Sequence, residues 1–223
     1  FKEITSLLYT INNKANNTIY DQKIICYSGL KYINEKIEDL SFKIGPKSFF
    51  QTNSKQAKKL YDIIKDEADL KGEEIVYDLY CGTGTIGIYL SDKAKKVFGF
   101  EIIPSAIDDA IINASNNKTK NALFFQGDIK ETLISNKEID IIEKPDVSIV
   151  DPPRSGLHPK ALKNIVDLNQ KKIIYISCNP ATQARDLKEI VKYGYKINKI
   201  KPIDMFPHTP HIETVVTLVN ERC

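Results

Sequence analysis

Two short segments near the C-terminal end of this 223-residue chain carry side chains that can make and break a covalent bond. Cys178, in Ser177-Cys178-Asn179-Pro180, closes an apolar run, so we expect its thiol at the end of a buried strand. Glu213, in His211-Ile212-Glu213, opens the last apolar run and offers a carboxylate. A thiolate is a nucleophile and a carboxylate is a base, so the pair favours covalent catalysis. Considered alone, a cysteine that ends a buried strand is more often a small inert residue.

A glycine-rich turn indicates a second kind of site. Residues 78–87 contain G-x-G-x-x-G, a pattern that is equally typical of a dinucleotide site. Three carboxylates near the turn help to distinguish between a dinucleotide and another cofactor. Asp78 precedes the glycines, Glu101 ends the next expected strand, and Asp128 follows the third. Carboxylates suit ribose hydroxyls, an amine and an adenine amino group better than they suit a pyrophosphate. This choice of ligand groups favours S-adenosylmethionine as the cofactor. Glu101 would bind the ribose and Asp128 the adenine edge, while Gly82 lets the backbone approach the ligand. The alternative is a set of ordinary strand-end caps and turn glycines.

The elements that must position these residues follow a regular order from Glu74 onward. Apolar runs alternate with helical patterns, which predicts a doubly wound, mostly parallel α/β sheet. The last two runs are joined only by Asp204 to Pro210, too short for a crossover helix, so they should pair antiparallel. Ligands bind at the carboxyl ends of such strands, where all the segments above lie. The expected strands are Glu74–Tyr80, Lys96–Glu101, Ala122–Gln126, Val147–Val150, Lys172–Ser177, Tyr195–Ile203 and Glu213–Val219.

The N-terminal part has a different pattern. Residues 1–47 predict a small, partial, β-rich accessory domain, and residues 48–223 the catalytic domain. A helix is expected from its cap Asn53 to about Leu70. Because Phe1 already falls within an expected strand, we expect the chain to be a piece of a longer protein. The expected N-terminal strands are Ile4–Ile11, Thr18–Tyr20, Lys23–Tyr27 and Leu40–Ile44.

Composition narrows the class of protein. The formal net charge of +3 is too small to prove a polyanion partner, although lysine-rich stretches can form local basic faces. Four scattered cysteines match neither a metal site nor a disulfide framework and suggest a reducing, cytoplasmic location. His208 and His211 lack a third ligand type nearby in the sequence, so we expect no metal. No membrane span is expected either.

The chain resembles the RNA uracil-5-methyltransferases, which use S-adenosylmethionine. The resemblance covers nearly the whole chain and implies a Rossmann-like class I methyltransferase fold and an RNA substrate, for which we expect ribosomal RNA rather than transfer RNA. The oligomeric state stays open. The motifs that carry the resemblance, in order, are Ser48-Phe49-Phe50-Gln51-Thr52-Asn53, the turn from Asp78 to Gly84, Asp151-Pro152-Pro153-Arg154, Ser177-Cys178-Asn179-Pro180, and Asp204-Met205-Phe206-Pro207 through Glu213.

The resemblance implies a mechanism that activates carbon 5 of uracil for methylation. Carbon 5 of uracil is a poor nucleophile, so a thiolate first adds to carbon 6, and a base later removes the hydrogen from carbon 5. Cys178 matches the family's nucleophile and Glu213 its base. Arg154 suits either an RNA phosphate or a structural carboxylate. The positions that match the cofactor and uracil pocket are Gln51, Tyr80, Gly82, Thr85, Glu101, Asp128 and Asp151; Thr85 stands where some relatives carry Asn.

The target edge of a stacked base is hidden, so we expect a uridine that is splayed out of the RNA. Phe49, Phe50 and Phe206 are candidates to receive it, with core packing as the alternative. Cys81 is expected to pack beside the cofactor turn. Three other functions stay open: a related methyltransferase for another base position, which has no need of Cys178; a non-catalytic RNA-binding module; and a dinucleotide oxidoreductase, which rests on the glycine turn alone.

Overall fold

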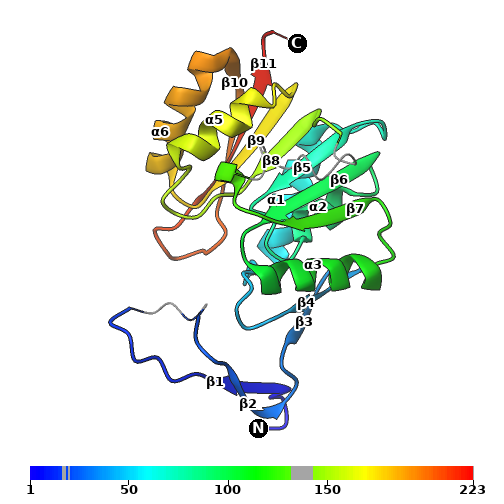
Figure 1. The fold of residues 1–223 in the computed structure, drawn as a ribbon, viewed down its shortest axis with the longest axis vertical. Helices are drawn as coiled ribbons and strands as arrows, with labels where there is room; N and C mark the ends of the chain where they lie inside the picture. Colours follow the sequence, from blue (N-terminus) through cyan, green and yellow to red (C-terminus); the bar gives the residue numbers. More distant parts are fainter. Residues whose placement is uncertain (17–18, 20, 132–142, 223) are drawn as a thin grey trace.

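A computed structural model describes residues 1–16, 19, 21–131 and 143–222. Its centre is a seven-stranded sheet in the order β10-β11-β9-β8-β5-β6-β7 (Figure 1). Neighbours from β9 to β7 pair parallel, while β11 pairs antiparallel with both β9 and β10. This confirms the predicted mostly parallel sheet with an antiparallel C-terminal strand. The strands are β5 (Ile75–Leu79), β6 (Lys96–Glu101), β7 (Ala122–Gln126), β8 (Val147–Val150), β9 (Lys172–Ser177), β10 (Tyr195–Ile203) and β11 (Glu213–Asn220).

Helices cover both faces of this sheet. The first face carries α1 (Ser54–Ala68), α2 (Thr85–Leu90) and α3 (Pro104–Asn116), and the second carries α5 (Pro159–Asp167) and α6 (Pro180–Ile190), followed by the short turn η1 (Val191–Tyr193). Strand residues alternate between the two faces. In β9, for example, Ile174 and Ile176 join the first core cluster, whereas Ile173 and Tyr175 join the second. Burial on both sides explains why these strands are continuous apolar runs.

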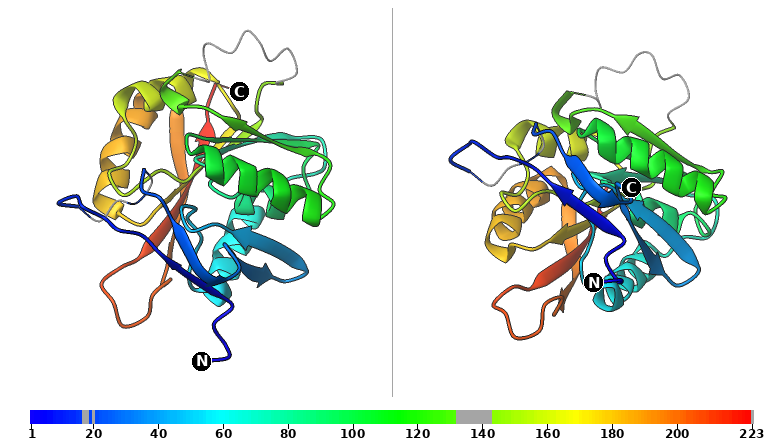
Figure 2. Two further views of the ribbon diagram at one scale, coloured as in Figure 1. Left: turned by 60° about the horizontal axis from the view of Figure 1, so that its bottom comes forward. Right: turned by 90° about the horizontal axis from the view of Figure 1, so that it is seen from below.

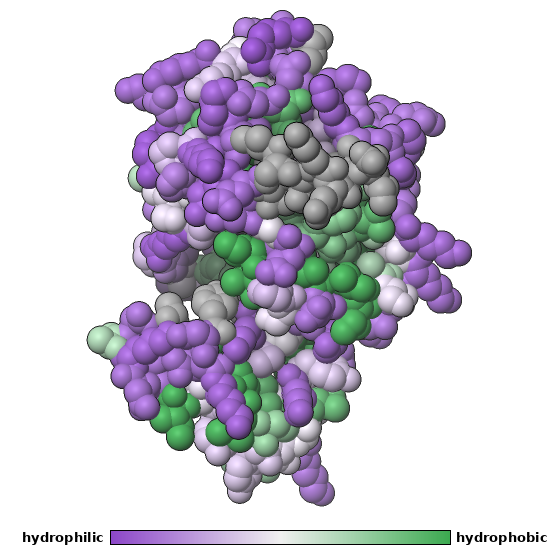
Figure 3. All heavy atoms as spheres, in the orientation of Figure 1, coloured by the Kyte–Doolittle hydropathy of each residue, from purple (hydrophilic) through white to green (hydrophobic). Residues whose placement is uncertain are grey.

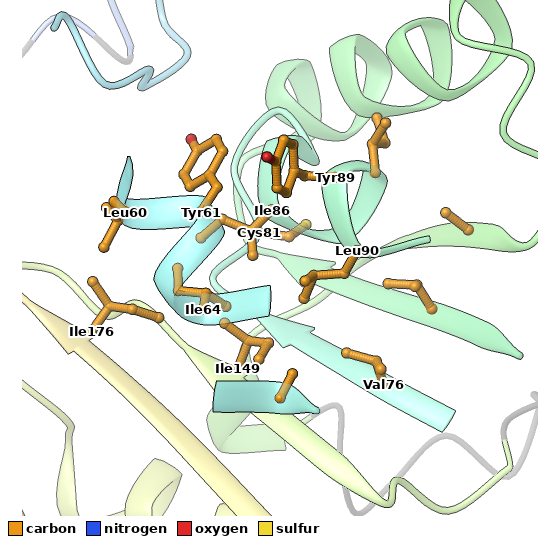
Figure 4. Packing of buried hydrophobic residues seen from close by; sticks show 14 of the residues in the cluster. Leu60, Tyr61, Ile64, Val76, Cys81, Ile86, Tyr89, Leu90, Ile149 and Ile176 are labelled. Atoms are coloured by element: carbon orange, nitrogen blue, oxygen red, sulfur yellow. The ribbon is translucent and has the colours of Figure 1, made fainter. Parts of the chain in front are cut away.

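Helix α1 closes one end of the core. Its Asn53 cap accepts a hydrogen bond from the amide of Gln56, as the sequence predicted, and the helix ends two residues before the expected Leu70. Leu60, Tyr61 and Ile64 pack against the sheet beside α2 (Figure 4). Burying one such side chain stabilises the fold by about 1.5–3 kcal/mol.

The N-terminal strands form two separate two-stranded antiparallel sheets, β1 (Ser6–Tyr9) with β2 (Ile25–Gly29) and β3 (Ile33–Ile37) with β4 (Leu40–Ile44). The expected strand at Thr18–Tyr20 includes residues 18 and 20, which lie outside the described residues. Strand β3 was not predicted, because a charged Ile-Asn-Glu-Lys-Ile sequence is a weak strand signal. Its pairing with β4 across a turn with Glu38 at φ 53° forms the strand.

These N-terminal strands lie across the carboxyl edge of the parallel strands (Figure 2). Phe42 and Ile44 join the first core cluster, so β4 packs onto the body of the protein. Apolar side chains gather at this junction (Figure 3). The division of the chain after residue 47 stays a prediction.

Among the described residues, no helix combines the length and the apolar character needed to cross a bilayer.

Candidate active site at the carboxyl edge of the sheet

Strand register brings Cys178 and Glu213 together. Thr214 of β11 pairs with Ser177 of β9, and Glu213 and Cys178 are the residues next to this last pair on the two segments. The charge of Glu213 raises the pKa of Cys178, so the two groups lie close enough to interact. Cys178 is exposed, whereas Glu213 is only 6% exposed. An exposed thiol therefore lies near a largely buried carboxyl group.

Further acids lie on the same face of the neighbouring strands. Asp78 is the penultimate residue of β5, and Asp151 directly follows β8. Burial raises the pKa of Glu213 to about 7, and burial with the charge of Glu101 raises that of Asp78 to about 7. Burial, then the charges of Glu213 and Asp78, raise the pKa of Asp151 well above its usual range. Glu213 and Asp78 can therefore both bind and release a proton near neutral pH.

These acids act on the thiol. Burial and the charges of Glu213 and Asp151 raise the pKa of Cys178, while the Arg154 guanidinium opposes the shift. The resting thiol is therefore protonated at neutral pH, and a nucleophilic thiolate forms only when the proton leaves. The Arg154 carbonyl accepts hydrogen bonds from Asn179 Nδ2 at 3.2 Å and Thr182 Oγ1 at 3.3 Å, which ties the loop after β8 to the start of α6.

The glycine turn is shaped to admit a ligand. Tyr80, Gly82 and Gly84 all have left-handed backbones, with φ of 66°, 54° and 76°. A Cβ atom on Gly84 would lie 2.7 Å from the Phe124 ring, so this glycine permits close packing. At Gly82 the nearest such atom is the Phe49 carbonyl oxygen, 3.9 Å away, so Gly82 borders open space.

Two buried oxygens at this turn have no partner among the described residues. Asp78 Oδ2 accepts a hydrogen bond from the Gly87 amide at 2.8 Å, but its Oδ1 is unpaired, as is Thr83 Oγ1. An unpaired buried carboxylate oxygen is costly unless a donor such as an ammonium group satisfies it. The turn therefore fits an amine-bearing ligand better than a pyrophosphate.

Glu101 and Asp128 border a cavity of about 450 Å³ next to this turn. Glu101 accepts hydrogen bonds from the amides of Gly82 at 3.2 Å and Ile103 at 2.9 Å. Although burial acts against it, hydrogen bonds from Lys130 lower the pKa of Asp128, so this group is ionised. Pro153 of the Asp151-Pro152-Pro153-Arg154 motif lines this cavity. Sequence analysis did not single out the other lining residues after this motif or on α6, because no motif marks them; they are Ser155, Gly156, Leu157, His158, Pro159 and Arg185.

The segment with Gln51 borders the site on the face of the sheet that carries α1, α2 and α3. Gln51 is 6% exposed, and Asn53 Nδ2 donates to the Met205 carbonyl at 3.0 Å, which joins this segment to the β10–β11 loop. The Tyr61 hydroxyl donates to Thr85 Oγ1 at 3.1 Å. Burial raises the pKa of Tyr61 above its usual range, with a contribution from Asp151. The sequence analysis did not single out Tyr61, because its contact with Thr85 joins two segments that no motif links.

The three phenylalanines that were candidates to receive a base differ in their environments. Phe50 is buried in the core and Phe206 packs partly against it, whereas Phe49 is 67% exposed. Core packing therefore accounts for Phe50, and Phe49 is the most accessible of the three. Cys81 is buried, as expected, and burial raises the pKa of its thiol.

The two histidines of the β10–β11 loop, His208 and His211, are exposed. Across the described part of the chain, no group of three or more His, Cys, Asp or Glu side chains is placed to hold a metal ion.

Known proteins share this arrangement of sequence and fold. The sequence model of the family described as tRNA (Uracil-5-)-methyltransferase matches residues 18–221. The chain is 51% identical over 218 residues, 98% of this chain and 48% of the relative, to a protein of Bacteroides thetaiotaomicron named an uncharacterized RNA methyltransferase. It is 47% identical over 96% of its length, and 46% of the relative, to a protein of the same name from Clostridium tetani. The chain thus spans about half the length of these curated relatives.

A solved structure agrees with the sequence matches. The crystal structure of the Pyrococcus abyssi tRNA (uracil-54, C5)-methyltransferase in complex with S-adenosyl-L-homocysteine has 37% sequence identity and a TM-score of 0.79. The match covers 97% of this chain and 51% of that one. The chain belongs to the tRNA (uracil-5-)-methyltransferase family.

Proposed function

We propose that this protein transfers a methyl group from S-adenosylmethionine to carbon 5 of a uridine in RNA. The observation that carries the proposal is the proximity of Cys178 and Glu213 at one end of β9 and β11. A methyl transfer to a ring nitrogen has no need of this pair, whereas a transfer to carbon 5 requires both a nucleophile and a base. Membership of the uracil-5-methyltransferase family supports the same reaction.

The residues around the glycine turn fit this cofactor. Glu101 would hold the ribose hydroxyls and Asp128 the adenine edge, while Tyr80 would contact the adenosine. The unpaired Oδ1 of Asp78 would bind the amine, beside the open backbone of Gly82. Bound S-adenosylmethionine supplies an electrophilic methyl group. Gln51, Thr85 and Asp151 would shape the end of the pocket nearest the uracil.

The side chains of the chain then act in sequence on the uracil ring. Cys178 loses its proton, and its Sγ bonds to carbon 6 while the π electrons of the C5–C6 bond move onto the O4 enolate. After carbon 5 gains the methyl group, that carbon holds both the methyl and its original hydrogen. Glu213 removes this hydrogen as a proton, the C5–C6 double bond returns, and the bond to Sγ breaks. With its pKa near 7, Glu213 is suited to this step.

Ribosomal RNA as the substrate stays a prediction, and so does a cytoplasmic location. The Pyrococcus abyssi neighbour is named for a tRNA, so both RNA classes must be tested. The test supplies the protein with S-adenosylmethionine and either 23S rRNA or tRNA lacking the modification, then measures 5-methyluridine by nucleoside mass spectrometry.

We expect 5-methyluridine with the wild-type protein and none with Cys178→Ala. Glu213→Gln should accumulate a methylated protein–RNA adduct, because addition and transfer proceed without the final proton removal. Full turnover by Cys178→Ala, or a methylated nitrogen in the product, would contradict the proposal and favour the related enzyme class.

A further inference from the structure

One edge of strand β4 is covered by side chains of helix α3. The other edge pairs with β3, which leaves the backbone groups of alternate β4 residues facing the helix. The amide of Asn117 bonds both backbone groups of Ser41, accepting from its N–H at 2.9 Å and donating to its carbonyl at 2.8 Å. The amide of Asn113 does the same for Lys43, at 2.7 Å and 3.1 Å. These side chains take the place of a neighbouring strand.

A third rung completes this ladder, where Asp109 accepts a hydrogen bond from the Gly45 amide at 2.9 Å. The regular spacing of these contacts follows from the repeat distances of a helix and of a strand. Four residues of a helix rise about 6 Å, and two residues of a strand rise about 6.6–6.8 Å, so side chains spaced by four meet every second strand residue. The rungs at 109, 113 and 117 therefore hold β4 in a fixed register along α3.

Asn113 makes one contact that the other rungs do not. Its Nδ2 also donates to the carbonyl oxygen of Thr83, at 3.1 Å, inside the glycine turn. Asn113 is completely buried, so both of these acceptors depend on it rather than on water. Downstream of β4, the chain returns to the same turn, where the Phe49 carbonyl approaches Gly82. One amide thus joins the glycine turn to the strand that leads into Gln51.

We propose that Asn113 is a positioning residue that couples the cofactor turn to residues 45–53, the segment that closes the first face of the active site. The inference rests on the proposed function, because it takes the turn to be the cofactor site. Cofactor binding fixes the Thr83 carbonyl, and through Asn113 it restrains β4 and the segment that follows. A ligand at the turn therefore orders the uracil end of the pocket.

Asn113→Asp tests this coupling, with Asn117→Asp as a matched control. Each wild-type amide donates two hydrogen bonds and accepts one: Asn113 to Lys43 and Thr83, and Asn117 to Ser41 and the Asn113 carbonyl. Each variant therefore loses the two donated hydrogen bonds and keeps the accepted one, but only Asn113→Asp loses the contact with the turn. The measurements are the dissociation constant of S-adenosylhomocysteine by calorimetry, hydrogen exchange of residues 40–53 with and without this ligand, and the melting temperature.

We expect S-adenosylhomocysteine to slow exchange in residues 40–53 of the wild-type protein and of Asn117→Asp, but not of Asn113→Asp. We also expect at least about tenfold weaker binding for Asn113→Asp and less than about threefold for Asn117→Asp, because only the first loses a buried hydrogen bond at the turn. Equal binding and equal protection in the two variants would overturn the inference.

The wild-type protein keeps the test valid if Asn113→Asp does not fold. Ligand binding that leaves the exchange of the Lys43 amide unchanged would overturn the coupling on its own, because that amide donates directly to Asn113. A wild-type protein that does not bind S-adenosylhomocysteine would overturn the proposed function, and this inference with it.

Discussion

At the scale of single residues, the charge on Glu213 controls the reactivity of Cys178. Glu213 has a pKa of about 7, so above neutral pH it is ionised and raises the pKa of the thiol beside it. Glu213→Gln removes this charge, so we expect Cys178 to be alkylated by iodoacetamide several-fold faster at pH 8; one full pKa unit would give about tenfold. The rate is followed for the Cys178 peptide by mass spectrometry.

Glu221→Gln is the matched control, because Glu221 is exposed and lies just beyond the opposite end of β11. It should leave the alkylation rate unchanged. A slower reaction in Glu213→Gln would contradict the arrangement of the two groups.

Asp78 gives stability a pH dependence. Its pKa rises from 3.8 to about 7 in the folded protein, so folding binds a proton between these values. The stability is complete below about pH 4 and falls by roughly 2–4 kcal/mol as the pH rises to 7. Asp78→Asn cannot ionise, so its melting temperature should exceed that of the wild type at pH 8, and the difference should shrink as the pH falls and vanish below about pH 4. The surface variant Asp92→Asn should not show this trend, and a pH-independent difference for Asp78→Asn would contradict the account.

Motifs predicted the residues that meet at the site but not all of their neighbours. Cys178, Glu213 and the glycine turn were found because each ends or begins an apolar strand, and parallel strands bring such ends to one edge. Tyr61 looked like an ordinary core residue, because its role depends on a partner 24 positions away. A weak pattern in the sequence pointed to Asn113 and was not used. Asn113 is one of several polar residues spaced by four along α3, and the alanines of the same helix, Ala106, Ala110 and Ala114, are buried.

At the scale of elements, Glu67 fixes the end of α1 to the last two strands. Its carboxylate is 8% exposed and accepts hydrogen bonds from Lys199 at 3.0 Å, Lys201 at 2.8 Å and Thr217 at 3.0 Å. Although burial acts against it, these donors lower the pKa of Glu67 to about 2. The stabilisation is therefore present above about pH 4.5 and is lost as the pH falls through 2.

We expect Glu67→Gln to lower the free energy of unfolding at pH 7 by about 1–3 kcal/mol, measured by urea denaturation. The difference from the wild type should shrink as the pH falls from 5 to 2, because the wild-type carboxylate is then protonated. The exposed Glu73→Gln serves as the control. A loss that stays constant down to pH 2 would argue against the charged contact.

Strong periodicity made the body of the fold predictable, whereas the N-terminal elements depended on tertiary contacts. The central strands β5, β8 and β9 were found because they are buried on both sides. Strand β3 carries charged residues and is stabilised by β4, which is itself held by the polar side chains of α3. No local pattern contains that information.

At the scale of the whole molecule, a cleft of about 850 Å³ lies between β2 and the start of α3. Lys23, Lys31 and Lys47 line it, and none of them has a carboxylate partner within the described residues. We expect replacement of all three by alanine to weaken RNA binding and to reduce the salt dependence, by up to about 2–3 in the slope of log K against log salt. Fluorescence anisotropy with labelled RNA at several salt concentrations measures this.

The affinity for S-adenosylhomocysteine should not change in that triple variant. Alanine at Lys93, Lys118 and Lys120, exposed lysines near the opposite edge of the sheet, provides the control and should change RNA binding less. An equal effect of the two triple variants would mean that the cleft is not a preferred RNA contact.

The central claim, covalent attack by Cys178, is tested most directly with RNA that contains 5-fluorouridine. Fluorine on carbon 5 cannot leave as a proton, so the adduct cannot resolve after methyl transfer. In the presence of S-adenosylmethionine, the account predicts a denaturation-resistant protein–RNA complex whose cross-linked peptide contains Cys178, and no complex with Cys178→Ala. A cross-link at another residue, or a complex that persists in Cys178→Ala, would contradict it.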